Sequence, residues 1–148
     1  MRYKEEYRDL FSVPEDYYLA HCISADFGMG KGIVVQFNYR FNMKNKLKSK
    51  YPNFLSDYQK YHYGGMALIE DRAINLITKE RYWQKPTYET LRNALKVARF
   101  RIPHDCKKIA MPAIGTGLDR LSWNRVSKII KDVFEDTDIE ILVCFLEE

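Results

Sequence analysis

The fold of this 148-residue chain is decided by the stretch from Lys108 to Asp119, which reads KIAMPAIGTGLD. Its first half, 108–113, is a short apolar run and predicts a buried strand. Its second half is a turn containing two glycines, and from about Ser122 the chain has the apolar spacing of an amphipathic helix. A strand that passes through a glycine turn into a helix is typical of α/β domains. The stretch therefore predicts an α/β fold class.

The same arrangement occurs once more, nearer the N-terminus. The apolar run 17–23 predicts a central strand, and 27–32, FGMGKG, predicts a second glycine turn. The residues 33–37 that follow are predicted to be helical in spite of their β-branched side chains. The chain thus contains two strand–turn–helix units of the same kind.

The rest of the chain predicts further strands and helices before, between and after these two units. The runs 66–70 and 73–78 predict two strands joined by a tight turn, and a clear amphipathic helix follows, with Thr87 as its N-cap. A long apolar strand is predicted for 139–146, and 2–7 is predicted to be an edge strand. Alternating strands and helices of this kind predict a layered α/β domain.

The least regular region is 43–65, which predicts a basic helix, a Tyr-rich connection and a break at the two glycines 64 and 65. The chain has 24 Lys and Arg against 20 Asp and Glu, a net charge of +4, and no acidic residue lies between 40 and 50. The excess therefore lies in one segment, whose cations are Arg40, Lys44, Lys46, Lys48 and Lys50. With the neighbouring aromatic residues, these cations suit a single-stranded nucleic acid, but a solvated helix whose aromatic residues face the core explains them better.

Length and composition fit one compact domain over 1–148, because 46% of the residues are hydrophobic and 14% are aromatic. Neither a signal peptide nor a membrane span is predicted, since the chain begins with charged residues and its longest apolar run is short. Three cysteines, Cys22, Cys106 and Cys144, are widely spaced, which predicts neither disulfides nor a zinc site. The sequence therefore predicts a protein of the cytoplasm, or of the nucleus in a eukaryote, without a metal.

The two glycine turns predict a binding site for an anion. Each turn is expected to present free backbone N–H groups beside the start of a helix, and glycine lets an anion approach those groups closely. Neither turn has the Rossmann or P-loop spacing. One such turn alone is more typical of a structural loop, but two in equivalent positions favour a pyrophosphate between them, and hence a nucleotide diphosphate ligand.

Two charged residues lie beside these turns in the sequence. Lys79 follows the apolar run 73–78, and Asp119 closes the second glycine turn. A lysine at a strand end can serve as a nucleophile when it is desolvated, and a nearby carboxylate can carry its protons. Because the two residues are forty positions apart, spacing alone favours two ordinary solvated charges.

Several motifs together resemble the macrodomains, which are ADP-ribose-binding α/β modules, and within them the terminal ADP-ribose protein glycohydrolase group. The resemblance extends over nearly the whole chain and implies a single macrodomain over 1–148. The implied fold is a three-layer α/β/α sandwich with a mixed sheet of about six strands, and ADP-ribose would lie across the strand ends. The motifs are DLF at 9–11, LAHCIS at 19–24, MGKGI at 29–33, LITK at 76–79, KPTYE at 85–89 and MPAIGTGLDRL at 111–121, with Trp123.

The resemblance also implies which residues hold ADP-ribose. Asp9 and the backbone of Leu10 would bind the adenine, while the two glycine turns would hold the pyrophosphate and the distal ribose. Ser24, Thr78 and Phe145 would make secondary contacts. The full implied set is Asp9, Leu10, Ile23, Ser24, Met29, Gly30, Lys31, Gly32, Ile33, Thr78, Pro112, Ile114, Gly115, Thr116, Gly117, Leu118 and Phe145.

For catalysis, the resemblance implies that Lys79 attacks the anomeric carbon of the distal ribose and that Asp119 assists ring opening and resolves the lysine adduct. The implied substrates are ADP-ribose esters of Glu or Asp, or small acyl esters such as O-acetyl-ADP-ribose, and no cofactor is needed. This reverses the interpretation of the two residues as ordinary charges. Three alternatives remain open: removal of ADP-ribose from DNA, as in antitoxin-like members, a non-catalytic ADP-ribose reader, and an ADP-ribose 1″-phosphate phosphatase. The chain departs from the family at Arg8, where glycine is usual, and at Lys31, where a small residue is common.

Overall fold

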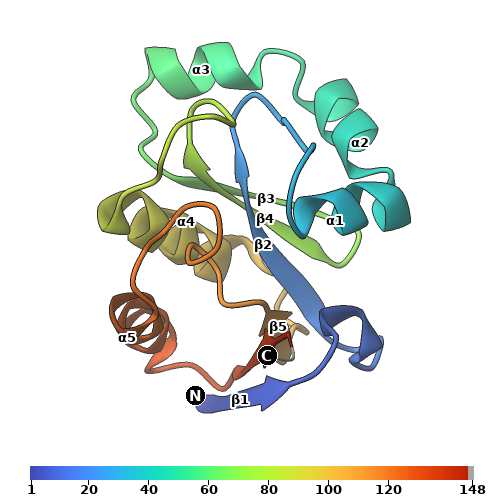
Figure 1. Cartoon of the computed structure of the whole chain (residues 1–148), viewed down its shortest axis with the longest axis vertical. Helices are drawn as coiled ribbons and strands as arrows, with labels where there is room; N and C mark the ends of the chain where they lie inside the picture. The colour runs from blue at the N-terminus through green and yellow to red at the C-terminus, as the bar shows by residue number, and fades with distance from the viewer. Residues whose placement is uncertain (147–148) are drawn as a thin grey trace.

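The computed structural model describes residues 1–146. Its six strands form one sheet in the order β1-β6-β5-β2-β4-β3 (Figure 1). All neighbouring strands are parallel except β3 and β4, which form an antiparallel hairpin. The mixed six-stranded sheet predicted from the resemblance is therefore confirmed. The strands are β1 (Arg2–Tyr7), β2 (Tyr18–Ser24), β3 (Met66–Glu70), β4 (Ala73–Lys79), β5 (Lys108–Met111) and β6 (Glu140–Phe145).

Helices cover both faces of the sheet. On one face, α4 (Tyr88–Arg101) and α5 (Trp123–Phe134) pack against the strands through the apolar stripe that their sequences predict. The other face is covered by the short 3₁₀-helix η1 (Leu10–Ser12) and by α1 (Val34–Phe41), α2 (Met43–Lys50) and α3 (Phe54–Lys60). The protein is thus a three-layer α/β/α sandwich, as predicted.

The predicted elements are present with small shifts at their ends. The edge strand, the central strand β2, the β3–β4 hairpin and the helix capped by Thr87 are confirmed, and the Thr87 side chain accepts a hydrogen bond from the backbone N–H of Thr90. The strand predicted for 108–113 ends at Met111, and the strand predicted for 139–146 spans Glu140–Phe145. Both differences are within the usual uncertainty of element ends.

The Tyr-rich region was predicted to be an irregular connection, but it contains a helix. Residues Phe54–Lys60 form the helix α3, and Phe54 and Tyr58 on it are buried in the core. Phe54 packs against the rings of Tyr51 and Tyr63. This confirms the interpretation in which most of the aromatic side chains face the core, whereas Tyr61 is 58% exposed. Among the helices of residues 1–146, none is long and apolar enough to cross a membrane.

A buried polar pair stabilises the centre of the sheet. His21 on β2 and Asn75 on β4 are fully buried, and 2.6 Å separates His21 Nε2 from Asn75 Oδ1. Because the Asn75 amide nitrogen donates to the carbonyl of Leu68, its oxygen accepts from His21, which assigns a proton to Nε2. The ring also stacks on Phe37, with 3.6 Å between ring centroids. Burial lowers the pKa of His21 to about 4, in spite of the opposing hydrogen bond to Asn75.

This pair predicts a loss of stability in mild acid. The unfolded chain protonates His21 below about pH 6.5, whereas the folded protein does so only near pH 4, so the free energy of unfolding falls as the pH falls through this window. The loss of stability due to His21 reaches about 3 kcal/mol near pH 4, where the folded protein begins to bind the same proton. Urea unfolding at several pH values should show that His21→Gln removes this component, while His104→Gln, at an exposed position, does not. Equal pH profiles for all three proteins would contradict the prediction.

Candidate active site between the two glycine turns

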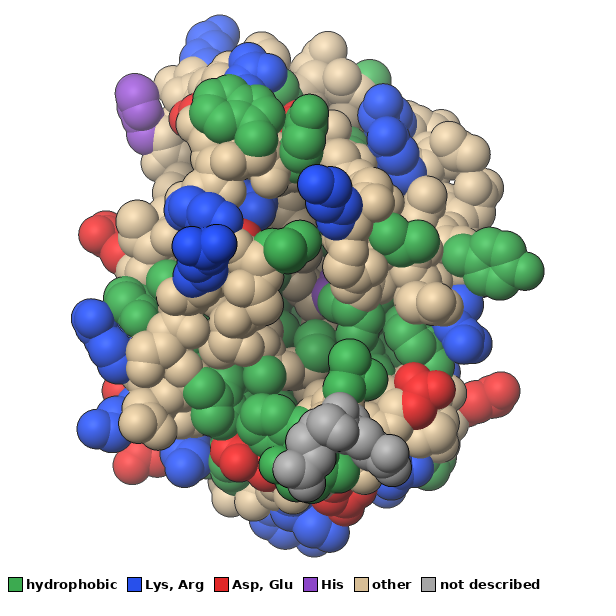
Figure 2. Space-filling model, viewed as in Figure 1, with side chains coloured by type: hydrophobic (Ala, Val, Ile, Leu, Met, Phe, Trp, Pro, Cys, Tyr) green, Lys and Arg blue, Asp and Glu red, His purple; other side chains and the backbone are tan. Residues whose placement is uncertain are grey.

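The two glycine turns meet at the carboxyl ends of the central strands. The first, 27–32, follows β2 and leads through Ile33 into α1, and the second, 114–119, follows β5. A Cβ added at Gly32 would lie 3.9 Å from Cδ1 of Leu118, so the turns approach each other closely. Gly32 and Gly115 have φ angles of 79° and 75°, a left-handed conformation that favours glycine. Figure 2 shows this face of the molecule hollowed in its middle, with hydrophobic side chains around the hollow and Lys and Arg side chains above it.

Both turns leave backbone N–H groups free. Within the described residues, no N–H of 29–33 donates to another protein group, and the same holds for Gly115, Gly117 and Leu118. In contrast, Thr116 N–H and its hydroxyl both donate to the carbonyl of Ala113, which fixes the shape of the second turn. Such an array of free N–H groups matches the anion site predicted from the sequence. Only the first turn runs directly into a helix, because α5 begins at Trp123, beyond Asp119.

Lys79 and Asp119, forty residues apart in the sequence, lie in contact beside the turns. Lys79 is the last residue of β4, and its Nζ lies 2.7 Å from Oδ1 of Asp119. Each side chain is 14% exposed, so the pair is largely shielded from water but accessible from one side. The interpretation as two separate solvated charges, which spacing alone favours, is therefore wrong. The pair places a primary amine and a proton acceptor at one point.

The thiol of Cys22 lies in the same electrostatic environment. Burial, together with the negative charge of Asp119, raises the pKa of Cys22 to about 12, although the positive charge of Lys79 opposes this shift. The thiol therefore stays protonated at neutral pH and is a poor nucleophile. The thiol of Cys22 is therefore a poor candidate for the nucleophile of this site.

Two residues that the sequence analysis did not select hold the site together. The carboxylate of Asp26 accepts hydrogen bonds from the N–H groups of Gly28 and Tyr82, both at 3.1 Å, and from the hydroxyl of Ser24. It thereby ties the first glycine turn to the β4–α4 loop. Lys85, from the same loop, donates to the carbonyl of Leu118 in the second turn. An Asp two residues before a glycine is a sequence signal for such a turn, whereas nothing local predicts the contact of Lys85.

The residues expected to bind adenine lie at the far end of the hollow, where β1 and β6 end. Asp9 is exposed and caps η1, because its Oδ1 accepts from Phe11 N–H at 3.0 Å. Leu10 is buried, and Phe145 is partly exposed and packs against the rings of Tyr7 and Trp123. Tyr7 and Phe145 are register partners, so Asp9 and Phe145 lie at the same edge of the sheet.

Some of the other residues expected to contact ADP-ribose are buried, and the rest are partly or fully exposed. Ser24 pairs with Lys79 across the β2–β4 ladder, after a register shift between Ile23 and Ser24. The side chains of Ile23, Ser24, Met29, Thr78 and Ile114 are buried. The partly or fully exposed positions are Gly30, Lys31, Gly32, Ile33, Pro112, Gly115, Thr116, Gly117 and Leu118. The hydroxyl of Ser24 donates its hydrogen bond to the carboxylate of Asp26 and so stabilises the loop.

The basic segment 40–50 lies outside this hollow, and three of its cations are already engaged. Lys46 and Lys50 form ion pairs with Asp71 and Glu70, and the guanidinium of Arg40 lies 4.4 Å from the centre of the Phe11 ring. The two ion pairs reduce the net charge that the segment presents to a partner.

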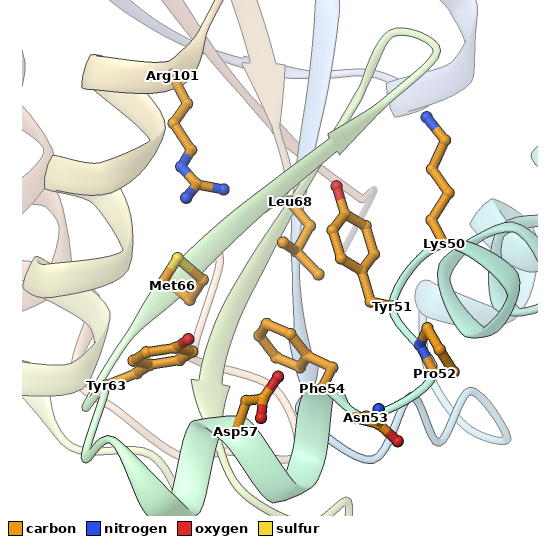
Figure 3. A pocket seen from close by; sticks show the side chains of 10 residues that line it. All are labelled: Lys50, Tyr51, Pro52, Asn53, Phe54, Asp57, Tyr63, Met66, Leu68 and Arg101. Atoms are coloured by element: carbon orange, nitrogen blue, oxygen red, sulfur yellow. The ribbon is translucent and has the colours of Figure 1, made fainter.

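A cavity of about 270 Å³ lies next to this segment, along the edge strand β3 (Figure 3). The side chains of Tyr51, Phe54 and Tyr63 line it, and Lys50 and Arg101 lie at its borders. Arg101 donates to the edge-strand carbonyl of Ala67 at 3.4 Å. Neither Lys79 nor Asp119 lines this cavity, so it is separate from the candidate active site.

Comparisons with known proteins agree with this geometry. No family model matches the sequence. ADP-ribose glycohydrolase OARD1 of Bos taurus is 42% identical over 139 residues, which cover 91% of this chain and 86% of the relative, and the Homo sapiens protein is 41% identical over the same shares. The macrodomain of Thermus aquaticus DarG superposes with a TM-score of 0.74 at 22% identity, covering 96% of this chain and 97% of that one. On the strength of its OARD1 relatives and its fold, the chain belongs to the macrodomain family.

Proposed function

We propose that this protein is an ADP-ribosyl hydrolase that cleaves ester bonds between ADP-ribose and an acyl group, on glutamate or aspartate side chains or on small acids such as acetate. The observation that carries the proposal is the contact of Lys79 Nζ with Asp119 Oδ1, at 2.7 Å, beside the two glycine turns. The identity to ADP-ribose glycohydrolase OARD1 supports the same class of reaction.

The proposed ligand would extend across the strand ends. Its adenine would lie near Asp9 and Phe145, where the carboxylate and an aromatic ring are available. The pyrophosphate would lie between the two turns and accept hydrogen bonds from their free N–H groups. The distal ribose would then reach Lys79, since the two turns lie on either side of this route.

The proposed reaction has two stages. Asp119 first accepts a proton from the Lys79 ammonium, and the freed amine attacks the anomeric carbon, so that a C–N bond forms, the ester C–O bond breaks and the carboxylate leaves. Asp119 then assists opening of the ribose ring and addition of water, which breaks the C–N bond and releases ADP-ribose. Because a carboxylate is a better leaving group than an alkoxide, this mechanism favours esters over O-glycosides such as serine conjugates.

The alternatives differ in what they leave unexplained. A non-catalytic reader needs the hollow but gives the Lys79–Asp119 pair no role. A 1″-phosphate phosphatase would use the same hollow and remains a side activity to test. Removal of ADP-ribose from nucleic acid would use the cations of segment 40–50, of which Lys46 and Lys50 are ion-paired to acidic residues. Ester hydrolysis uses both members of the pair and is therefore preferred.

A substrate panel tests the proposal. The protein is incubated with five ADP-ribose conjugates, linked to glutamate in a peptide, to acetate, to serine, to phosphate and to single-stranded DNA, and release is followed by chromatography. We expect repeated turnover of the glutamate and acetate esters and none of the serine conjugate. Tight binding without turnover of any conjugate would establish a reader instead, and preferential turnover of the DNA or phosphate conjugate would replace the proposed substrate.

We also propose that the protein is located in the reducing cytoplasm. This location is supported by the three cysteines, all free thiols, of which Cys106 and Cys144 are buried.

A further inference from the structure

A second cavity, of about 340 Å³, adjoins the candidate active site on the other side of Lys79. It lies at the carboxyl end of β4, between α3 and the start of α4, and Gln59, Lys79 and Thr90 contribute walls from these three elements. Neither glycine turn lines it. Lys79 therefore lies between two spaces, the hollow over the turns and this cavity.

The position of Lys79 determines what the second cavity can accept. If ADP-ribose occupies the hollow, its anomeric carbon lies at the Lys79 amine, and the group attached to that carbon must extend away from the glycine turns. Lys85 also borders both spaces, since it lines the cavity and donates to the carbonyl of Leu118 in the second turn. We propose that this cavity is a leaving-group subsite, which holds the peptide segment around an ADP-ribosylated glutamate or aspartate. The inference rests on the proposed function.

The cavity wall has both covered and accessible polar groups. Tyr58 and Thr78 line the cavity, but they are only 4% and 1% exposed, and protein atoms cover their hydroxyl oxygens. The hydrogen-bonding groups that a ligand can reach include Gln59 and Gln84, whose side chains are partly exposed. A bound peptide group can donate and accept hydrogen bonds with such side chains.

The charges of the cavity favour a peptide over a nucleic acid strand. Its two lysines are engaged elsewhere, Lys79 by Asp119 and Lys85 by the carbonyl of Leu118. Glu80 adds a negative charge to the wall, which would repel phosphate groups. The remaining polar lining consists mainly of hydroxyls and amides, which match neutral peptide groups. The cavity thus complements the backbone around an esterified acidic residue.

The test fills the cavity without changing the Lys79–Asp119 pair. Gln59→Trp places a bulky side chain in the cavity, and Ser56→Trp, on the exposed surface of the same helix and outside the cavity, is the matched control. We expect Gln59→Trp to raise KM for a glutamate-linked peptide at least about tenfold and to leave O-acetyl-ADP-ribose hydrolysis within about twofold. Ser56→Trp should leave both substrates unchanged.

A second variant and a binding measurement keep the test independent of folding and turnover. Gln59→Ala removes one partly exposed amide from the cavity wall, so it should fold normally and raise KM for the peptide substrate about threefold to fivefold, with the acetyl ester unaffected. A serine-linked peptide conjugate should bind the wild type more tightly than free ADP-ribose does. Gln59→Trp should remove that difference and leave the Kd of free ADP-ribose unchanged.

The outcomes separate the subsite from the proposed function. Failure of the wild type to hydrolyse either ester would contradict the proposed function, whereas hydrolysis of both with equal effects of Gln59→Trp on each would contradict only the subsite. Selective loss of activity on ADP-ribosylated single-stranded DNA, with the peptide unaffected, would overturn its assignment to a peptide. Selective loss of the peptide substrate would support it.

Discussion

Replacement of Lys79 by alanine should reduce ester hydrolysis by at least about 10³-fold, because it removes the amine proposed to attack the anomeric carbon. The binding of free ADP-ribose should change little, since the proposed phosphate contacts come from the backbone of the glycine turns. Single-turnover kinetics with a glutamate-linked peptide measure the first effect, and calorimetric titration with ADP-ribose measures the second.

The matched control for this variant is Lys79→Arg. Arginine keeps the positive charge and can still pair with Asp119, so the site should stay folded and electrostatically similar. It cannot lose its proton at neutral pH, so it cannot act as the nucleophile, and hydrolysis should be lost to the same extent as in Lys79→Ala. Activity of Lys79→Arg close to that of the wild type would show that the charge, and not the amine, is what matters.

Most of the fold follows from local sequence patterns. The apolar stripe of α5 and the Thr87 cap of α4 are encoded within a few residues, and both elements form as predicted. Helix α3 was missed because it has only seven residues and lies in a stretch of aromatic and polar side chains without a clear period. Its stability comes from burial of Phe54 and Tyr58, which is a tertiary contact that no local pattern reports.

The candidate site was predictable only in part, for the same reason. The glycine turns could be selected as candidate anion sites because their composition determines which backbone conformations they can adopt. The contact between Lys79 and Asp119 depends on β2 lying between β4 and β5, and the sheet order cannot be read from either segment alone. Only the resemblance to macrodomains predicted that these two residues act together. The supporting bonds of Asp26 and Lys85 cross between loops and had no sequence signal of comparable strength.

The second large effect is expected at Asp119. Asp119→Asn keeps a group of the same shape next to Lys79 but removes the carboxylate that takes up and returns protons. General acid–base groups typically contribute about 10²-fold to 10⁴-fold in rate, and we expect a loss in this range for hydrolysis of the glutamate-linked peptide. Because Asp119 is proposed to act in both stages, steady-state rates alone do not show which stage is slowed.

Mass spectrometry of the intact protein shows which of the two stages is slowed in Asp119→Asn. If Asp119 resolves the lysine adduct, Asp119→Asn mixed with substrate should accumulate a covalent ADP-ribose adduct, and peptide mapping should place it on Lys79. The adduct should be absent from the wild type at steady state, where it turns over, and from a Lys79→Ala/Asp119→Asn double variant, where it cannot form. The double variant should also be no slower than Lys79→Ala alone, because residues that act as a unit are not additive. Two results together would contradict the two-stage mechanism: no adduct on Asp119→Asn, and slower hydrolysis by the double variant than by Lys79→Ala. They would show that the two residues act independently.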